Sequence, residues 1–294
     1  MKKLFLVCAV AFIGLGQASA QLETKDYGIF NRVGVGVGVG TTGITIDAAT
    51  VITPYVGVRA GVDIFPNIKV NTDLDLGVEG ANATIGQYSG HITELNKLLP
   101  DNQQIPANIP EQLDVQGEAK LGGGHVLFDV YPFPKASSFR VTVGAYFGSE
   151  KVIDVYNKKN GALLSVSRWN AAMENPMARP FVEQYGLKKI GAELGDYFIA
   201  PDGQGNMDAS IKVNSFRPYL GLGFGRAVPK KRIGCQFDLG VQFWGTPKVM
   251  VTDASGEREL KAENAGGDGG DVIKVISDIS VYPVLSFRLV GRIL

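Results

Sequence analysis

The sequence predicts an all-β fold, an eight-stranded antiparallel transmembrane up-and-down β-barrel with short periplasmic turns and long extracellular loops. Period-two alternation of apolar and polar residues recurs along the chain, which is typical of strands whose two faces meet different surroundings. Glycine accounts for 38 of 294 residues, nearly twice the usual share of about 7%, and alternates with valine, leucine and phenylalanine. Beyond the N-terminal apolar run no stretch is long enough for a transmembrane helix, so a membrane form of this chain would cross with strands.

The N-terminus has the pattern of an export signal. Two lysines precede an apolar run from Leu4 to Gly16, and Ala18-Ser19-Ala20 provides a small-residue cleavage site. The run is shorter than the ~20 residues of a spanning helix, which argues against an uncleaved anchor. We therefore expect residues 1–20 to be a cleaved signal peptide and residues 21–294 to form a single outer-membrane β-barrel domain, located in the outer membrane of a Gram-negative bacterium.

Composition narrows the classes of partner. Lys+Arg and Asp+Glu number 29 each, so nothing indicates nucleic acid or another polyanion as a partner. Cys235 is the only cysteine after the signal, which rules out an intramolecular disulfide and leaves a large core or a closed sheet as the source of stability. We predict no cofactor and no metal site.

The first predicted strand, Val33 to Gly40, alternates valine with glycine. Glycine inside a strand costs conformational entropy and removes packing, so the pattern needs a structural reason. On the inner face of a narrow barrel, a column of glycines leaves room for large polar side chains from other strands. Further segments with alternating character are Tyr55–Phe65, Ile68–Gly80, Glu118–Tyr131, Phe139–Phe147, Tyr219–Gly225, Ile233–Trp244 and Ile279–Leu294.

The last of these strands, Ile279–Leu294, has one apolar face and one face that carries Arg288 and Arg292. In a soluble sandwich the apolar face would meet a second sheet, whereas in a membrane barrel it would meet lipid. We expect lipid, and we expect this strand to pair antiparallel with Val33–Val39, which closes the sheet and removes its open edges. A soluble β-sandwich with ordinary core aromatics is the alternative.

The connections between the predicted strands alternate in length. Short, proline-containing links are predicted at Phe65-Pro66-Asn67, at Tyr131–Pro134 and just before Ile233, and long polar loops at about 81–117, 148–212 and 246–271. Outer-membrane barrels have this asymmetry, with short periplasmic turns and long extracellular loops. The segment Thr41 to Pro54 is intermediate in length and is interpreted as a link. Short helices are predicted within the loops at His91–Leu99 and Pro180–Gly195.

Aromatic residues are predicted to form two belts at the membrane interfaces. The expected periplasmic members are Phe65, Tyr131, Phe133, Phe139 and Tyr282, and the expected outer members are Phe147 and Phe243.

The predicted inner face of the barrel gathers a cluster of charged residues. Opposite charges in a confined lumen pair with one another, because leaving either one unpaired out of water is costly. Such a cluster would act either as a salt-bridged plug or as the lining of a narrow path for small polar solutes. Its predicted members are Arg59, Asp63, Asp129, Arg140, Asp238, Arg288 and Arg292.

Two histidines, His91 and His125, are available for acid-base chemistry. An outer-membrane enzyme that modifies lipid A needs a histidine near the outer leaflet beside a serine and usually a carboxylate. His91 lies in a loop, and His125 lies in a strand beside Asp129 with no serine at matching spacing. We predict that the protein is not an enzyme and has no catalytic residues.

Strand-and-turn signatures occur at Asp129–Phe133, Phe139–Gly144, Pro218–Gly225 and Phe237–Pro247. These segments resemble small eight-stranded bacterial outer-membrane proteins of the type of the OmpA membrane domain and OmpW. The resemblance covers most of the mature chain except the loops and implies an outer-membrane barrel, with no catalytic residue to carry over. The chain departs from this family in its large third outer loop and in ending at Leu294, where such barrels commonly end in an aromatic residue.

These patterns predict a non-enzymatic outer-membrane protein with a structural or surface-interaction role. A narrow pore for passive diffusion of small polar solutes is the alternative, and a lipid A-modifying enzyme is a more remote one. The expected partners are outer-membrane lipid and, during biogenesis, the barrel-assembly machinery. Small solutes and surface partners are open alternatives, since no ligand is indicated by any motif.

Overall fold

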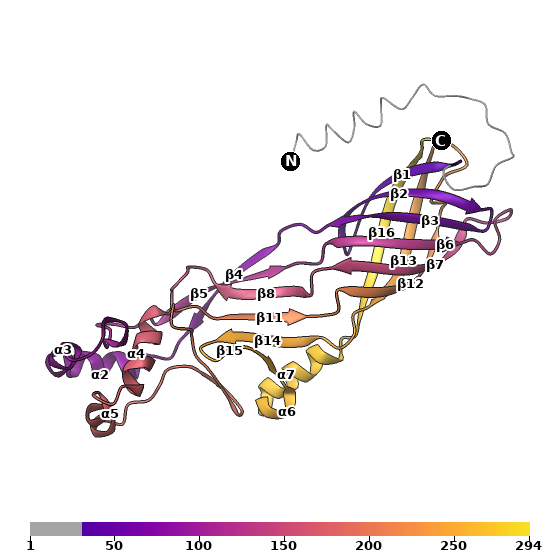
Figure 1. The fold of residues 1–294 in the computed structure, drawn as a ribbon. Helices are drawn as coiled ribbons and strands as arrows, with labels where there is room; N and C mark the ends of the chain where they lie inside the picture. Colours follow the sequence, from indigo (N-terminus) through magenta and orange to yellow (C-terminus); the bar gives the residue numbers. More distant parts are fainter. Residues whose placement is uncertain (1–30) are drawn as a thin grey trace.

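The computed structural model describes residues 31–294, so the predicted signal peptide lies outside the described residues. Eight antiparallel strands form a closed barrel in the order β1-β16-β13-β12-β7-β6-β3-β2 (Figure 1). Each strand neighbours the previous and the next barrel strand along the chain, as in an up-and-down barrel. The predicted all-β class and the closed eight-stranded antiparallel barrel are therefore confirmed. The barrel strands are β1 Val33–Gly40, β2 Gly43–Thr53, β3 Val56–Ile64, β6 Gly123–Val130, β7 Phe139–Gly148, β12 Phe216–Phe224, β13 Ile233–Phe243 and β16 Val281–Arg292.

The barrel closes between its first and last strands. Strand β1 pairs antiparallel with β16 in a register that sets Gly34 opposite Arg292 and Gly40 opposite Ser286. This closure, which was predicted from the two-faced character of the last strand, leaves no unpaired edge in the barrel. Its two ends differ, and we call them the turn end, where β16 finishes, and the loop end, where β16 begins.

One barrel strand was missed by the sequence analysis. The segment Thr41 to Pro54, interpreted as a link, contains β2, which pairs with β1 on one side and β3 on the other. Thr41 and Thr42 form a two-residue hairpin turn. Gly43 follows with φ 101°, a backbone conformation that residues with a side chain rarely adopt. Threonine, alanine and one aspartate replace most of the large apolar residues in β2, so its alternation is weak in sequence.

A second prediction was wrong in the same region. The segment Ile68–Gly80, predicted as the third barrel strand, contains β4 (Lys69–Asp75), which lies outside the barrel and pairs with β5 (Gln112–Ala119). The proline at Phe65-Pro66-Asn67 does not turn the chain back into the barrel. It marks the place where the chain leaves β3 and continues beyond the loop end.

The three long connections are not simple loops, because they build a second sheet beyond the loop end. This loop-end sheet has six strands in the order β15-β14-β11-β8-β5-β4, and most of them continue barrel strands (Figure 1). Strand β8 follows β7, β14 follows β13, and β11 leads into β12. The remaining bounds are β8 Lys151–Asn157, β11 Asp208–Lys212, β14 Lys248–Asp253 and β15 Gly256–Leu260.

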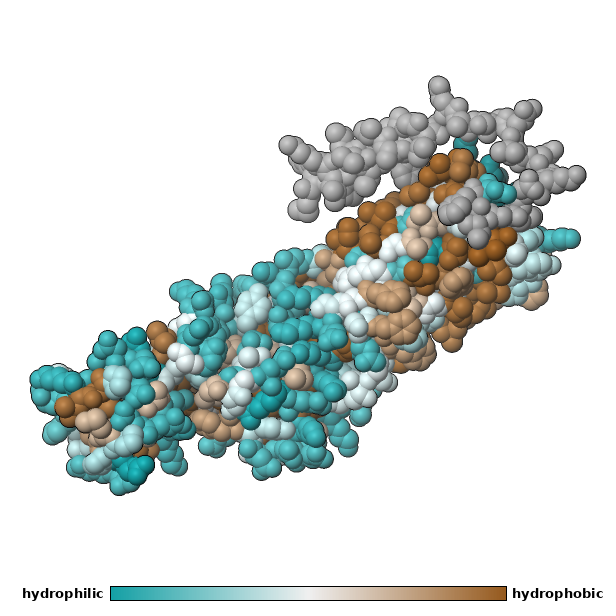
Figure 2. All heavy atoms as spheres, in the orientation of Figure 1, coloured by the Kyte–Doolittle hydropathy of each residue, from teal (hydrophilic) through white to brown (hydrophobic). Residues whose placement is uncertain are grey.

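The two faces of the loop-end sheet differ. The pairing register aligns Val70, Gly117, Val155, Ala209 and Val251 on one face. The other face carries ion pairs, among them Lys212 with Glu257 and Lys120 with Asp154. Figure 2 accordingly shows a largely hydrophilic surface over the loop-end sheet and a largely hydrophobic one over the barrel.

Helices complete the part of the chain beyond the loop end. We call the part of the chain that packs around Trp169 and Ile109 the distal lobe, and both of these side chains are fully buried. The distal lobe includes both segments predicted to be helical. In the second of these, α5 ends at Tyr185 because Gly186 adopts φ 59° and terminates the helix. No helix in residues 31–294 is long and apolar enough to cross a membrane. The remaining elements are α2 Glu79–Gln87, α3 Ser89–Asn96, η1 Asp101–Gln103, α4 Leu164–Glu174, α5 Arg179–Tyr185, β9 Ala192–Leu194, β10 Tyr197–Ile199, α6 Ala262–Ala265 and α7 Gly267–Asp278.

The connections differ in length between the two ends of the barrel, as predicted. One short link differs from the prediction, because it is the link 54–55 and not Phe65-Pro66-Asn67. At the turn end the links 54–55, 131–138 and 225–232 are short, and at the loop end the links 65–122, 149–215 and 244–280 are long. The exception is the hairpin between β1 and β2, which is a short turn at the loop end.

Two aromatic residues were assigned to the wrong end. Phe65 follows the loop end of β3, and Tyr282 lies at the loop end of β16, where its hydroxyl donates to the Thr41 carbonyl oxygen at 2.8 Å. Tyr131 is at the predicted end, but it is buried and its hydroxyl accepts a hydrogen bond from the Ala227 amide at 2.9 Å.

The glycine column of β1 leaves space for a large side chain, as the sequence indicated. Gly38 lies opposite Arg288, and a Cβ added at Gly38 would overlap the Arg288 side chain and come within 2.6 Å of the Phe287 carbonyl oxygen. The same crowding recurs at Gly36, where the obstructing group is the Asp47 carboxylate.

We predict that Gly38→Ala lowers the free energy of unfolding by about 1–3 kcal/mol, because overpacking forces neighbouring side chains off their preferred positions. Urea unfolding in detergent micelles, followed by heat-modifiable gel migration, measures the change. Gly86→Ala in α2 is the control, since no atom other than those of its chain neighbours and its own helix backbone lies within 4 Å of its added Cβ. Equal midpoints for the two variants would contradict the prediction.

Candidate functional site

The interior of the barrel holds a network of buried charges, which we call the lumen network. Its members come from six strands and are at most 5% exposed. Six of the seven residues proposed from the sequence belong to it, and two more, Asp47 and His125, join them. The lumen network is Asp47, Arg59, Asp63, His125, Asp129, Arg140, Asp238 and Arg288.

Asp238 on β13 is the centre of this network. Its carboxylate accepts hydrogen bonds from Arg59 at 3.0 and 3.2 Å, from Arg140 at 2.7 Å and from Arg288 at 2.9 Å. These arginines lie on β3, β7 and β16, so one carboxylate links four strands around the barrel. Charge-assisted hydrogen bonds of this kind are stronger than neutral ones and fix the geometry of the guanidinium groups.

Asp129 on β6 holds two of the same arginines from the other side. The Nε atoms of Arg59 and Arg140 lie 3.3 and 3.2 Å from its carboxylate oxygens, and the Thr142 hydroxyl donates to it at 2.7 Å. Arg59 and Arg140 are therefore each bracketed by two carboxylates, Asp129 and Asp238.

His125 joins the two remaining aspartates. Its Nδ1 atom lies 2.8 Å from Asp63, and its Nε2 atom faces Asp47 at 3.9 Å. Asp63 also accepts hydrogen bonds from the hydroxyls of Thr45 at 2.6 Å and Thr42 at 3.1 Å. Asp47 in turn pairs with Arg288, which connects this group to Asp238.

The charges of the lumen network balance when His125 is protonated. Four aspartates face three arginines, and an imidazolium with an N–H directed at each of Asp63 and Asp47 supplies the missing positive charge. Buried charges persist only when they are paired and hydrogen-bonded, so a neutral network is the arrangement that a closed lumen can hold.

Arg292, which the sequence analysis placed in the lumen cluster, lies apart from the network. It is near the turn end of β16, and its guanidinium donates to the Lys230 carbonyl oxygen at 3.1 Å. Alternation places Arg292 on the same face as Arg288, but Arg292 is four residues closer to the turn end, where side chains reach solvent and the turn before β13.

A group of apolar side chains, which we call the apolar cap, packs together at the loop end of the barrel. Trp244 stacks on Tyr282 with ring centroids 4.7 Å apart and an interplanar angle of 6°, and both side chains pack with the buried Val152 and Val213. The Arg217 guanidinium lies 5.6 Å from the centroid of the Trp244 ring and donates to the carbonyl oxygens of Asn214 and Ser149.

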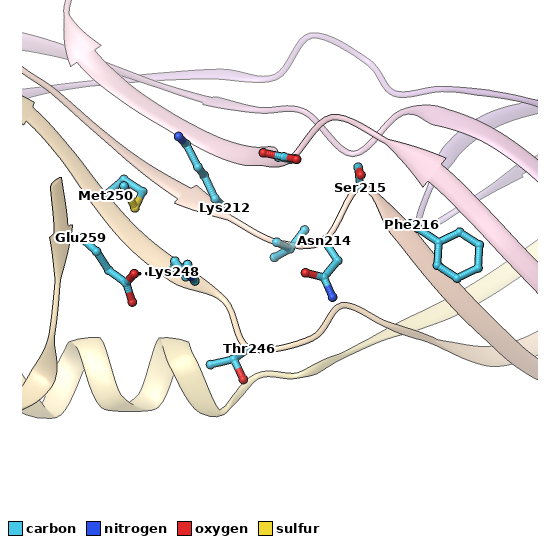
Figure 3. A pocket seen from close by; sticks show the side chains of 10 residues that line it. Lys212, Asn214, Ser215, Phe216, Thr246, Lys248, Met250 and Glu259 are labelled. Carbon is cyan, nitrogen blue, oxygen red and sulfur yellow. Dashed lines mark ion pairs between the residues drawn. The ribbon is translucent and has the colours of Figure 1, made fainter. Parts of the chain in front are cut away.

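A hollow of about 570 Å³ lies where the barrel meets the loop-end sheet (Figure 3). Two lysines and two glutamates line it, and Lys248 pairs with Glu259 at 3.3 Å. Lys212 pairs with Glu257 at 2.6 Å, and this contact lowers the pKa of the Glu257 carboxyl. Within residues 31–294 no group of three His, Cys, Asp or Glu side chains is arranged to hold a metal ion. The hollow thus presents paired charges at Lys248 and Glu259.

Two members of the network were not proposed from the sequence. Asp47 lies on β2, so it was lost with the strand that carries it. His125 was assigned to the inner face, but it was considered beside Asp129, four residues away on the same strand. Its contacts are to Asp63 on a neighbouring strand and to Asp47 beyond that, which only the barrel register brings together.

Comparison with known proteins gives distant structural similarity alone. No family model and no curated protein matches the chain. The crystal structure of CarO2 from Acinetobacter baumannii has 16% identity and a TM-score of 0.40, over 89% of this chain and 98% of that one. CarO from the same organism has 14% identity and a TM-score of 0.43, over 91% and 99%. A major outer membrane protein from Thermus thermophilus has 17% identity and a TM-score of 0.26, over 89% and 98%. Because these TM-scores are low, the barrel fold is assigned from the strand pairing of this chain and not from the comparisons.

We predict that Asp238→Asn lowers the free energy of unfolding by about 3–5 kcal/mol, because it leaves buried arginines without their shared counter-charge. Urea unfolding of the purified protein in detergent micelles measures the change. Glu257→Gln, at an exposed ion pair of the loop-end sheet, is the control and should leave the midpoint unchanged. An unfolding midpoint of Asp238→Asn equal to that of the control would show that the network does not hold the barrel together.

Proposed function

We propose that this chain is a non-enzymatic outer-membrane β-barrel protein with a closed lumen, whose role is to hold the loop-end sheet and the distal lobe at the cell surface for interaction. The lumen network carries this proposal, because it crosses the barrel interior and pairs its four aspartates with three arginines and His125. The barrel then acts as an anchor, and the part of the chain beyond the loop end is the functional surface.

The distribution of side chains supports a lipid environment for the barrel. Large apolar residues on the outside of the barrel strands are exposed, whereas charged residues are buried inside, which reverses the order of a soluble protein. Aromatic residues flank this surface at both ends, as interfacial belts require. The loop-end aromatics are Phe147, Phe216 and Phe243, and the turn-end aromatics are Phe133, Phe139 and Phe224.

The topology supports a surface role for the long connections. In barrels of this class the short turns face the periplasm and the long connections face outward. The three long connections contain the loop-end sheet and the distal lobe. Most of the residues outside the barrel strands therefore lie beyond the loop end of the barrel. Export by a cleaved signal and insertion by the barrel-assembly machinery belong to the same proposal.

The network favours a plug over a solute path. A selective path needs charges that exchange their hydration with a passing solute. Here Arg140 and Asp129 are fully buried and form an ion pair with each other, and Arg140 also pairs with Asp238. The apolar cap at Trp244 and Tyr282 adds a second obstruction at the loop end.

The position of His125 argues against lipid A chemistry. It is buried inside the barrel and directed at Asp63 and Asp47, with threonine hydroxyls of Thr42 and Thr45 on Asp63 and no serine in contact. A lipid A-modifying site has to face the outer leaflet. An unchanged lipid A profile on deletion of the gene is the expected result.

We predict that the purified protein produces no discrete currents in planar lipid bilayers, because paired side chains fill the lumen. Arg140→Ala should introduce leak currents, since it opens a gap and removes one of the positive charges that Asp129 and Asp238 share. Single-channel recording measures both. Arg292→Ala is the matched control, because this arginine lies outside the network. Its loss should leave the protein without discrete currents, as in the wild type.

Two outcomes would contradict the proposal. Discrete wild-type currents whose conductance changes in Arg140→Ala would identify the protein as a pore. Recovery of the protein in soluble form from the periplasm, without heat-modifiable migration on detergent gels, would show that the barrel is not a membrane barrel.

A further inference from the structure

Helix α7 has three different faces around its axis. Gly270 and Ile273 are buried, and Ile273 packs with Val251 and Leu260 on the apolar face of the loop-end sheet. At 3.6 residues per turn, the exposed remainder of the helix divides into two sides. Asp271, Lys274 and Asp278 lie on one exposed side, and Val272 and Val275 lie on the other.

The apolar exposed side is a continuous stripe that includes the residue after the helix. Val272 is 58% exposed, Val275 is 62% exposed and Ile279, which follows α7 directly, is 51% exposed. A helix with water on its whole exposed surface does not separate polar and apolar residues in this way. The separation indicates that one side meets water and the other meets an apolar phase.

The stripe continues into the apolar outer surface of the barrel. Figure 1 shows α7 leading directly into the loop end of β16. Ile279 is followed at the same alternation by Val281 and Leu285, both on the outer face of β16 and both exposed. Along α7 the only charged residue on this side is Asp268, at the end of the helix that is farthest from the barrel.

We propose that the Val272–Val275–Ile279 stripe of α7 lies in the outer leaflet of the bilayer, at the boundary between acyl chains and headgroups. This proposal rests on the proposed membrane location of the barrel and extends it to a segment beyond the barrel strands. The headgroup region of a bilayer is about 5–8 Å deep on each side, and Val275 lies roughly 6 Å along the helix from Ile279. Contact with lipid should therefore be greatest at Ile279 and least at Val272.

This contact fixes how the region beyond the barrel sits on the membrane. Because Ile273 ties α7 to β14 and β15, a helix held in the leaflet also holds that edge of the loop-end sheet close to the bilayer. The opposite edge, β4, has all seven residues exposed and is left free.

Lipid quenching of a fluorophore on single cysteines tests the proposal. The full-length mature protein is reconstituted in phosphatidylcholine vesicles that contain doxyl-labelled phosphatidylcholine, with the fluorophore NBD on one cysteine. Native Cys235, exposed on the outer face of β13, is the positive control for lipid contact. In a Cys235→Ala background, Val275→Cys is the test and Lys274→Cys, on the adjacent water-facing side of the same helix, is the matched control.

We predict quenching and a blue-shifted emission at Val275→Cys, weaker than at Cys235, and neither at Lys274→Cys. Heat-modifiable migration verifies that each variant is folded, and Ile279→Cys serves the same test if Val275→Cys fails to fold. Quenching at Cys235 with none at Val275→Cys or Ile279→Cys would overturn this proposal and leave the membrane location intact. No quenching at Cys235 would instead overturn the membrane location. A probe at Val275→Cys that is shielded from aqueous iodide but not quenched by lipid would show that protein covers the stripe, which also overturns it.

Discussion

The need to neutralise charge inside a closed barrel governs the rest of this structure. Asp238 bonds to three arginines from three other strands, and those arginines reach two of the three remaining aspartates, Asp129 and Asp47. An unpaired charge at this depth would be costly, so the strands must meet in the one register that pairs them all. The lumen network therefore favours one register for barrel closure.

Glycine in the neighbouring strands makes this arrangement sterically accessible. Arg288 occupies the volume that a side chain at Gly38 would need, and Asp47 occupies the corresponding volumes at Gly36 and Gly61. Strands that carry large charged side chains therefore pack beside strands that carry glycine at the facing positions. The apolar exterior follows from the same division, because every polar side chain that the barrel needs is already inside.

Beyond the loop end the physical problem changes. Strands leave the closed barrel and continue as an open sheet that has edges, a polar face and an apolar face partly covered by α7. Its ion pairs are at the surface and contribute little to stability, so the buried cores around Trp169 and Ile273 hold this region together. The proposed role of the barrel as an anchor for surface interaction is consistent with this arrangement.

The sequence by itself determined the class, the closure and most of the inner face, because period-two alternation is a local property that each strand shows on its own. Arg59, Asp63, Asp129, Arg140, Asp238 and Arg288 could be found in that way. Only the tertiary structure decided that β2 belongs to the barrel and β4 does not, since β2 alternates weakly, β4 alternates clearly, and the pairing partners decide membership. It also separated Arg288 from Arg292 and joined His125 to Asp47, because depth along the barrel and contact across strands are set by register, which no single strand encodes.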